Sequence, residues 1–100
     1  AVFGVMKDKD CARISEALKP VCKELIAVAP KIERAASTSD IVKIFRSHGV
    51  LAVDESSVAS GLRRALKESA SVPILITGSH FVCGEAMAWF NGKKYLTINQ

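Results

Sequence analysis

The sequence predicts an α/β fold: a Rossmann-like three-layer sandwich with a mostly parallel sheet of about four strands and helices on both faces. Short apolar runs rich in β-branched residues alternate with stretches that carry apolar residues at helical spacing. The connections between them are short, which is typical of parallel βα units with right-handed crossovers. Because 100 residues that are 49% hydrophobic can bury one core, we expect a single domain over residues 1–100.

The first part of the chain predicts two strands and a helix. Val2–Val5 is the first strand. Asp10 then caps a helix that Pro20 ends or kinks. The apolar positions expected on its buried face are Ile14, Ala17, Leu18 and Val21. The second strand, Leu25–Val28, is stopped by Pro30.

The middle of the chain predicts a helix, a strand and a second helix. Ser37 caps the first of these helices, with Asp40 three residues later as a partial capping box, and Gly49 marks its end. Its buried stripe is expected to be Ile41, Ile44 and Phe45. Val50–Val53 is the third strand, and the next helix begins near Ser56 or Ser57. The residues expected to be buried on that helix are Val58, Leu62, Ala65 and Leu66.

The last part predicts a buried strand at Ile74–Thr77 and a helix from about Ser79 to Phe90 that ends at Asn91-Gly92. Tyr95–Ile98 forms either a short edge strand or a docked tail. In parallel sheets, ligands bind outside the carboxyl ends of the strands. The segments expected along that one edge are Lys7–Asp10, Lys31–Ser37, Asp54–Ser56 and Gly78–His80.

Composition excludes several classes of protein. The net charge of +4 suits an anionic ligand, but the basic residues are dispersed and do not interleave with aromatic ones, so we expect no nucleic-acid partner. No apolar run approaches the ~20 residues of a membrane helix.

Cys11, Cys22 and Cys83 lie in apolar patterns without paired metal-ligand spacing. They predict buried thiols in a reducing cytoplasm and no metal site.

Residues Pro73–Glu85 carry the strongest chemical signal. A strand, the turn Thr77-Gly78-Ser79 and a helix start together make an anion-binding corner, because the helix offers unpaired N–H groups and its positive dipole end. Ser79 and His80 are candidate contacts for a ligand carboxylate or phosphate. Ser79 can equally serve only as an N-cap.

A second candidate is the charged turn, defined as Lys7, Asp8, Lys9 and Asp10. Its side chains either reach a polyphosphate, a magnesium ion or a ribose, or they are solvated while Asp10 caps the helix. Arg34 is a candidate anion contact from the loop after the second strand; alternatively it pairs with Asp8 or Asp10, or it is an ordinary surface arginine.

Motifs that bind nucleotides or hydrolyse esters on their own are missing from the sequence. It contains no Gly-x-x-x-x-Gly-Lys-Ser/Thr P-loop, no Gly-x-Gly-x-x-Gly run and no Gly-x-Ser-x-Gly elbow. If this domain serves a nucleotide enzyme, it does so as the partner of another domain.

Three segments resemble one family in their order and spacing. They are Phe3–Asp10 (Phe-Gly-Val-Met-Lys-Asp-Lys-Asp), Pro30–Ala35 and Leu75–Glu85 (Leu-Ile-Thr-Gly-Ser-His-Phe-Val-Cys-Gly-Glu). Together they are similar to the C-terminal domain of folylpolyglutamate synthase/dihydrofolate synthase, which shares its fold with the Mur ligases. The resemblance covers nearly the whole chain.

The resemblance implies ATP- and magnesium-dependent ligation of L-glutamate to folate or dihydropteroate through an acyl phosphate. It assigns Ser79 to the glutamate site and matches the charged turn to a charged turn of the family. ATP would sit mainly on a P-loop domain, and neither that domain nor the family's Asp-Gly-Ala-His-Asn-Pro segment is part of this sequence. We therefore expect no cofactor bound to the chain alone, no ligase activity from it, and self-association through an exposed sheet edge.

Two alternatives stay open. A Mur ligase C-terminal domain shares the fold and the mechanism, although the Asp-Lys-Asp turn favours the folate enzyme. A non-enzymatic α/β binding module is the second; a receiver-like module would need an acidic pair and a later lysine that do not accompany Asp54 in the required order.

Overall fold

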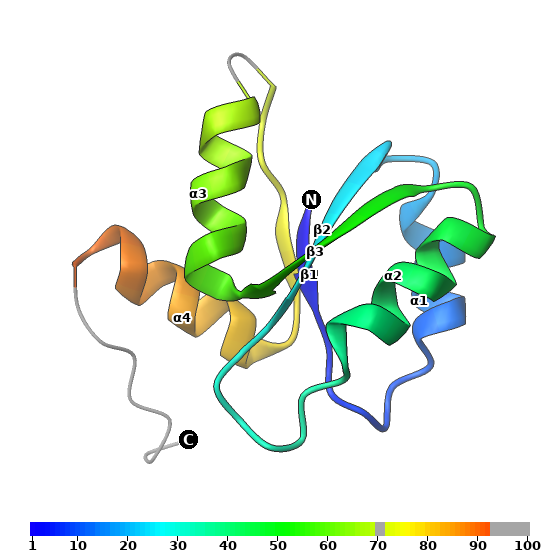
Figure 1. The fold of residues 1–100 in the computed structure, drawn as a ribbon, viewed down its shortest axis with the longest axis horizontal. Helices are drawn as coiled ribbons and strands as arrows, with labels where there is room; N and C mark the ends of the chain where they lie inside the picture. The colour runs from blue at the N-terminus through cyan, green and yellow to red at the C-terminus, as the bar shows by residue number, and fades with distance from the viewer. Residues whose placement is uncertain (70–71, 93–100) are drawn as a thin grey trace.

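A computed structural model describes residues 1–69 and 72–92 of the chain (Figure 1). Strands and helices alternate through these residues. Their bounds are β1 Val2–Gly4, α1 Cys11–Leu18, β2 Glu24–Ala29, α2 Thr38–Ser47, β3 Leu51–Ser57, α3 Val58–Glu68, β4 Ile76–Gly78 and α4 His80–Phe90.

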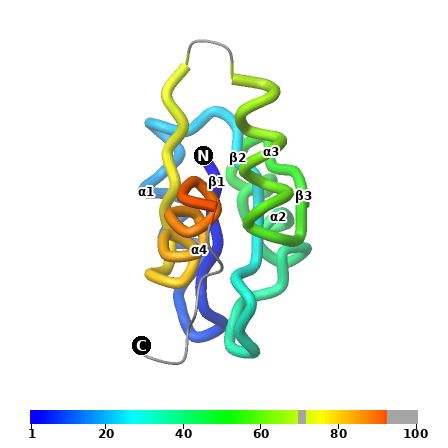
Figure 2. Tube along the Cα trace, turned by 90° about the vertical axis from the view of Figure 1, so that its left-hand side faces the viewer, coloured from blue at the N-terminus to red at the C-terminus, as the bar shows by residue number. Residues whose placement is uncertain are grey.

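The four strands form one sheet in the order β3-β2-β1-β4, and every neighbouring pair is parallel. β1 is therefore central, with Phe3 paired to Ala27 of β2 on one side and to Thr77 of β4 on the other. Helices α1 and α2 cover one face of the sheet, and α3 and α4 cover the other (Figures 1 and 2). The structure thus confirms the three-layer, parallel α/β fold.

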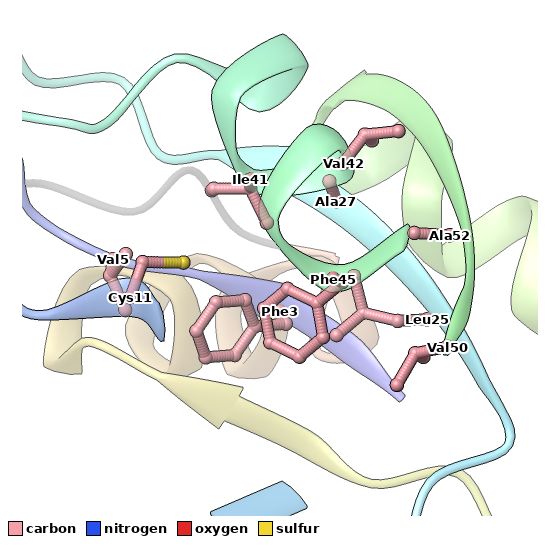
Figure 3. Packing of buried hydrophobic residues seen from close by; sticks show 10 residues of the cluster. All are labelled: Phe3, Val5, Cys11, Leu25, Ala27, Ile41, Val42, Phe45, Val50 and Ala52. Atoms are coloured by element: carbon pink, nitrogen blue, oxygen red, sulfur yellow. The ribbon is translucent and has the colours of Figure 1, made fainter. Parts of the chain in front are cut away.

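Each face of the sheet has its own core, because successive residues of a strand point to opposite faces. Under α1 and α2, Phe3 packs edge-on against Phe45 with ring centroids 5.1 Å apart (Figure 3). Under α3 and α4, Val2 and Val28 pack with Leu62 of α3 and with Val82 of α4. The strands therefore bury apolar side chains on both faces, as their near-continuous apolar runs predict.

Each helix begins at a residue whose side chain caps its first turn. The side chains of Asp10, Ser37, Ser57 and Ser79 accept hydrogen bonds from the backbone N–H groups of Arg13, Asp40, Ser60 and Val82, respectively. The predicted caps are confirmed, and Ser57 rather than Ser56 caps α3. Gly49 follows the end of α2 with a φ of +84°, as expected of a helix stop.

The predicted buried face of α1 was wrong in part. Ile14 and Leu18 do pack against the core, but Ala17 is exposed and Val21 is 72% exposed. The helix ends at Leu18, so Val21 lies beyond it. The buried face instead includes Cys11 and the fully buried Ser15, which continue the i, i+3, i+4, i+7 spacing of Ile14 and Leu18.

The third strand is longer than predicted, and Asp54–Ser56 lie within it rather than in a loop beyond its end. The pairing register with β2 shifts between Ala27 and Val28, and Ser56 adopts a φ of +64°. Asp54 Oδ1 accepts a hydrogen bond from the Ser56 N–H at 2.9 Å. This local bulge lets β3 stay paired with β2 as far as Ser57. The strand propensities of these residues did not indicate that the strand would extend this far.

β4 was predicted to be buried, but it forms one edge of the sheet. Leu75, just before it, is 45% exposed, and Ile74 and Ile76 are only partly buried. Leu66 of α3, also predicted to be buried, is 48% exposed. Ile74–Ile76 has the composition of a central strand, but the order of strands decides whether both of its faces are covered.

The remaining predictions concern the end of the chain. α4 ends at Phe90, and Asn91 caps it before Gly92, as predicted. Tyr95–Ile98 lies outside the described residues. Within the described residues, no helix is long and apolar enough to cross a membrane.

Candidate functional site

The carboxyl ends of the four strands face one edge of the sheet, because all the strands are parallel. The charged turn follows β1, the loop with Arg34 follows β2, and Ser79-His80 follows β4. Since β1 lies between β2 and β4, the charged turn lies between the loop that contains Arg34 and the turn Thr77–His80, here called the Ser79 corner. Asp54–Ser56 also lies toward the carboxyl end of its strand, but within β3 and not in a loop after it.

The chain leaves β1 and β4 toward opposite faces of the sheet, since α1 covers one face and α4 the other (Figure 1). Neighbouring strands whose connections diverge in this way form a topological switch point, where open α/β sheets bind their ligands. The switch point of this sheet therefore lies between the charged turn and the Ser79 corner.

The two strands of the switch point approach each other closely. Gly4 pairs with Gly78, and the Ser79 N–H donates to the Gly4 carbonyl at 3.0 Å. A Cβ on Gly78 would lie 1.9 Å from the Gly4 oxygen, and the Gly78 φ is +118°. This contact fixes the start of α4 against β1, so Ser79 is held at a defined place beside the charged turn.

Ser79 is half-buried, and its Oγ accepts a hydrogen bond from the Val82 N–H at 3.2 Å. The cap occupies a lone pair of the hydroxyl and leaves its proton available to donate. Ser79 can therefore cap α4 and hydrogen-bond a carboxylate at the same time. His80 is the exposed first residue of α4, beside the positive end of the helix dipole.

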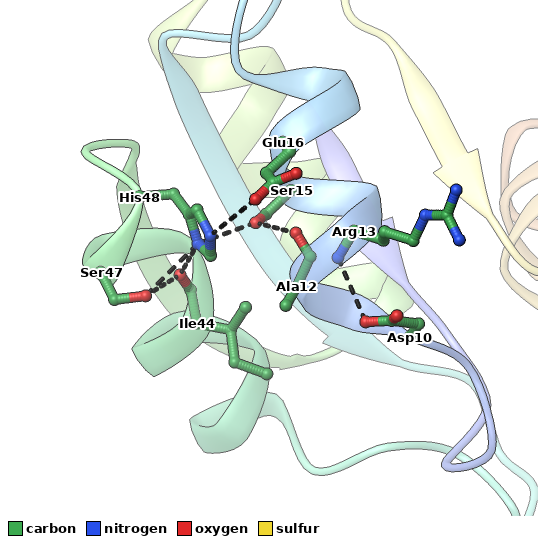
Figure 4. Close-up of polar contacts among 8 residues, drawn as sticks. All are labelled: Asp10, Ala12, Arg13, Ser15, Glu16, Ile44, Ser47 and His48. Atoms are coloured by element: carbon green, nitrogen blue, oxygen red, sulfur yellow. Dashed lines mark hydrogen bonds and ion pairs between the residues drawn. The ribbon is translucent and has the colours of Figure 1, made fainter.

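The charged turn has one carboxylate with a structural role. Asp10 Oδ1 accepts from the Arg13 N–H at 3.2 Å (Figure 4). The side chains of Lys7, Asp8 and Lys9 are exposed. In the part of the chain that the structure describes, no ion pair joins Arg34 to Asp8 or Asp10. Arg34 is exposed and contributes its backbone carbonyl, which accepts from the Lys7 N–H at 2.8 Å.

Backbone contacts hold the loops of this edge together. The Ala36 N–H donates to the Val5 carbonyl at 2.7 Å, and Met6 forms an antiparallel bridge with Ala35. From the other face, Glu85 of α4 accepts a hydrogen bond from the Lys31 N–H. The segments after β1, β2 and β4 are therefore connected, although 54 residues separate Lys31 from Glu85.

Sequence reasoning missed a hollow of about 410 Å³ between the charged turn and the first turn of α2. Lys7, Lys9 and Asp10 line one side of it, and Ser37 and Asp40 line the other. One sequence signal could have found it: Asp10 and Ser37 cap the helices that follow neighbouring parallel strands, so both helices begin at the same edge.

A polar cluster at the other end of α1 has the composition of a catalytic triad but not its chemistry (Figure 4). Ser15 Oγ lies 2.9 Å from His48 Nδ1, and Glu16 Oε1 lies 3.8 Å from His48 Nε2. Ser15 is fully buried and donates its proton to the Ala12 carbonyl at 2.8 Å, so it cannot reach a substrate. The cluster ties α1 to the end of α2.

The three cysteines are free, and two of them are buried. Cys11 and Cys22 are buried as predicted, whereas Cys83 is half-buried. Burial, reinforced by the Asp10 carboxylate, raises the pKa of the Cys11 thiol above its ordinary value of 9.0. Over residues 1–69 and 72–92, no three His, Cys, Asp or Glu side chains gather as metal ligands.

Comparison of the chain with protein-family models, with curated proteins and with solved structures finds no match.

Proposed function

We propose that the chain is the C-terminal domain of an ATP-dependent amide ligase that adds L-glutamate to folate or dihydropteroate through an acyl phosphate. The observation that supports this most is the juxtaposition of the Ser79 corner and the charged turn at the switch point of the sheet. These two segments also carry the resemblance to folylpolyglutamate synthase/dihydrofolate synthase.

In this proposal, the Ser79 corner receives the incoming amino acid. The Ser79 proton, which the cap leaves free, donates to a glutamate carboxylate, and His80 approaches from the start of the same helix. The N-terminal end of α4 adds about half a positive charge next to that carboxylate. Nothing in this role requires a nucleophile, because the glutamate amine attacks the acyl phosphate itself.

The ammonium groups of Lys7 and Lys9 serve the phosphate side. Positive groups stabilise the charge that develops on a transferring phosphoryl group. Asp8 is the one carboxylate of the charged turn that is exposed and does not cap a helix. It is therefore the candidate to accept a hydrogen bond from a magnesium-bound water. Arg34 is the candidate for a further anion contact from the neighbouring loop.

ATP and Mg²⁺ are assigned mainly to a partner domain that carries a P-loop. The residues present fit this division, because the exposed lysines of the charged turn and the N-terminus of α4 can meet anionic groups that a partner domain holds. The proposed enzyme belongs to folate biosynthesis and one-carbon metabolism in the cytoplasm, where the free thiols of this chain stay reduced.

Paired serine substitutions in the protein that contains this chain test the assignment. S79A removes a helix cap and the proposed glutamate contact, whereas S57A removes only a cap, at the start of α3. Each loses about 0.5–2 kcal/mol of stability. We expect S79A alone to raise the KM for glutamate, by about tenfold or more for the loss of a hydrogen bond to a charged group.

Equal KM values for glutamate in S79A and S57A would contradict the assignment of Ser79. The same assay, run with different acceptor substrates, tests the Mur ligase alternative. Ligation to a nucleotide-linked peptide instead of a folate would favour that alternative.

For the chain alone, we expect no ligation, and weak or no heat of binding when ATP and magnesium are titrated into it by calorimetry. ATP-dependent ligation by the chain alone would overturn the division between two domains.

A further inference from the structure

The hollow between the charged turn and α2 has the size of a small-molecule site. Its volume of about 410 Å³ lies in the range of about 300–1,000 Å³ that such sites occupy. Its lining shares Lys7 and Lys9 with the proposed phosphate side of the ligase but includes neither Ser79 nor His80, and its apolar floor does not depend on the ligase function.

The floor of the hollow is apolar. Val5, Cys11 and Ile41 line it and are 3%, 8% and 1% exposed, respectively. Figure 3 shows the three side chains at one end of the core cluster. Because burial raises the pKa of the Cys11 thiol, this group stays uncharged at neutral pH and adds no negative charge to the floor.

The rim of the hollow is charged. Lys7 and Lys9 contribute two ammonium groups, and Asp10 and Asp40 contribute two carboxylates. These charges cancel, so the N-termini of α1 and α2, at about +0.5 each, leave the rim with roughly one net positive charge. Asp10 already binds the Arg13 N–H, whereas no ion pair of the described residues engages Lys7 or Lys9.

The walls are fixed before any ligand arrives. The Ala36–Val5 backbone hydrogen bond of 2.7 Å joins the two sides directly, and the Lys7–Arg34 bond of 2.8 Å joins them one step further out. A ligand therefore does not have to order these loops, which lowers the entropic cost of binding.

We propose that this hollow binds a small monoanion with an apolar or aromatic body, of which an aromatic carboxylate is the simplest example. The body rests on Val5, Cys11 and Ile41, and the carboxylate faces Lys7 and Lys9.

Amide chemical shifts of the chain, titrated with benzoate, test the proposal. We expect saturable shifts centred on Lys9–Ala12 and Ser37–Ile41. Acetate has the charge without the aromatic body, and benzamide has the body without the charge, so both should bind there more weakly than benzoate. Benzoate shifts spread over the chain without saturation, or equal shifts from acetate, would overturn the proposal.

Two charge-matched variants sharpen the test. K7Q/K9Q removes both ammonium groups of the rim, and K23Q/K43Q removes two exposed lysines that do not line the hollow. We expect K7Q/K9Q to weaken benzoate about fivefold, as the loss of two exposed ion pairs implies, and K23Q/K43Q to leave its affinity unchanged. Equal weakening in both variants would show that only net charge matters and would refute the site.

Discussion

Replacing Gly78 with alanine tests the close contact that holds the candidate site together. Gly78 ends β4, and the next residue is Ser79. Its φ of +118° is a conformation that residues with a Cβ rarely adopt. A Cβ there would also lie 1.9 Å from the Gly4 carbonyl oxygen, which is part of the backbone and cannot rotate away.

The expected loss of stability has two parts. Holding alanine in a sparsely populated backbone region costs about 1–3 kcal/mol. Moving β4 away from β1 to relieve the contact costs about 1–3 kcal/mol more, as other overpacked sites do. The total, about 2–6 kcal/mol, is a large part of the roughly 5–15 kcal/mol that keeps a typical domain folded.

Gly92→Ala is the matched control, because Gly92 has a φ of +70° but a Cβ at this position would meet no atom of the described residues within 4 Å. It should lose only about 1–2 kcal/mol, the cost of the left-handed conformation. Urea unfolding followed by circular dichroism measures both variants. Equal losses of unfolding free energy in the Gly78 and Gly92 variants would refute the reasoning. The contact between β4 and β1 would then add nothing to the cost of the Gly78 substitution.

The remaining predictions concern the core, a thiol and the sheet edge. F45A should lose about 3–5 kcal/mol in the same urea assay, because Phe45 is fully buried against Phe3, and a loss below about 1 kcal/mol would contradict that packing. The raised pKa of Cys11 means that the folded state holds the thiol proton more tightly than the unfolded state, so its contribution to stability is present below about pH 9 and disappears as the pH rises above it. The unfolding free energy of C11A should therefore fall less between about pH 8 and 11 than that of the unsubstituted chain, and parallel curves would count against it. Light scattering of the chain at high concentration should detect self-association through the β4 edge, because Leu75, just before β4, is 45% exposed; a strictly monomeric chain would disprove this.

Local signals in the sequence were enough to predict most of the fold. Asp10, Ser37 and Ser79 mark helix starts because a short polar side chain before an apolar run satisfies the unpaired N–H groups of a helix. The parallel arrangement followed from short connections between alternating strands and helices, which leave few other topologies.

The errors came from effects that act between distant parts of the chain. Nothing within Ile74–Ile76 reveals that the strand lies at the edge of the sheet, because its neighbours are set by pairing with β1. The bulge at Ser56 depends in the same way on the register between β2 and β3. Local composition carries neither piece of information.

The candidate site, too, could be predicted only in part. The sequence placed Ser79 and the charged turn at one sheet edge, because both follow parallel strands. It could not show that β1 and β4 are neighbours, which makes this place the switch point. It also missed the hollow, whose floor joins Val5, Cys11 and Ile41 from three segments.

The reaction products of the proposed ligase that contains this chain decide whether it adds glutamate to a folate substrate. Mass spectrometry would follow folate or dihydropteroate incubated with that protein, L-glutamate, ATP and magnesium. We expect a product heavier by one glutamyl residue, formed only when ATP is present and lost or slowed in S79A. A protein that consumes no ATP with these substrates and leaves them unchanged would contradict this expectation.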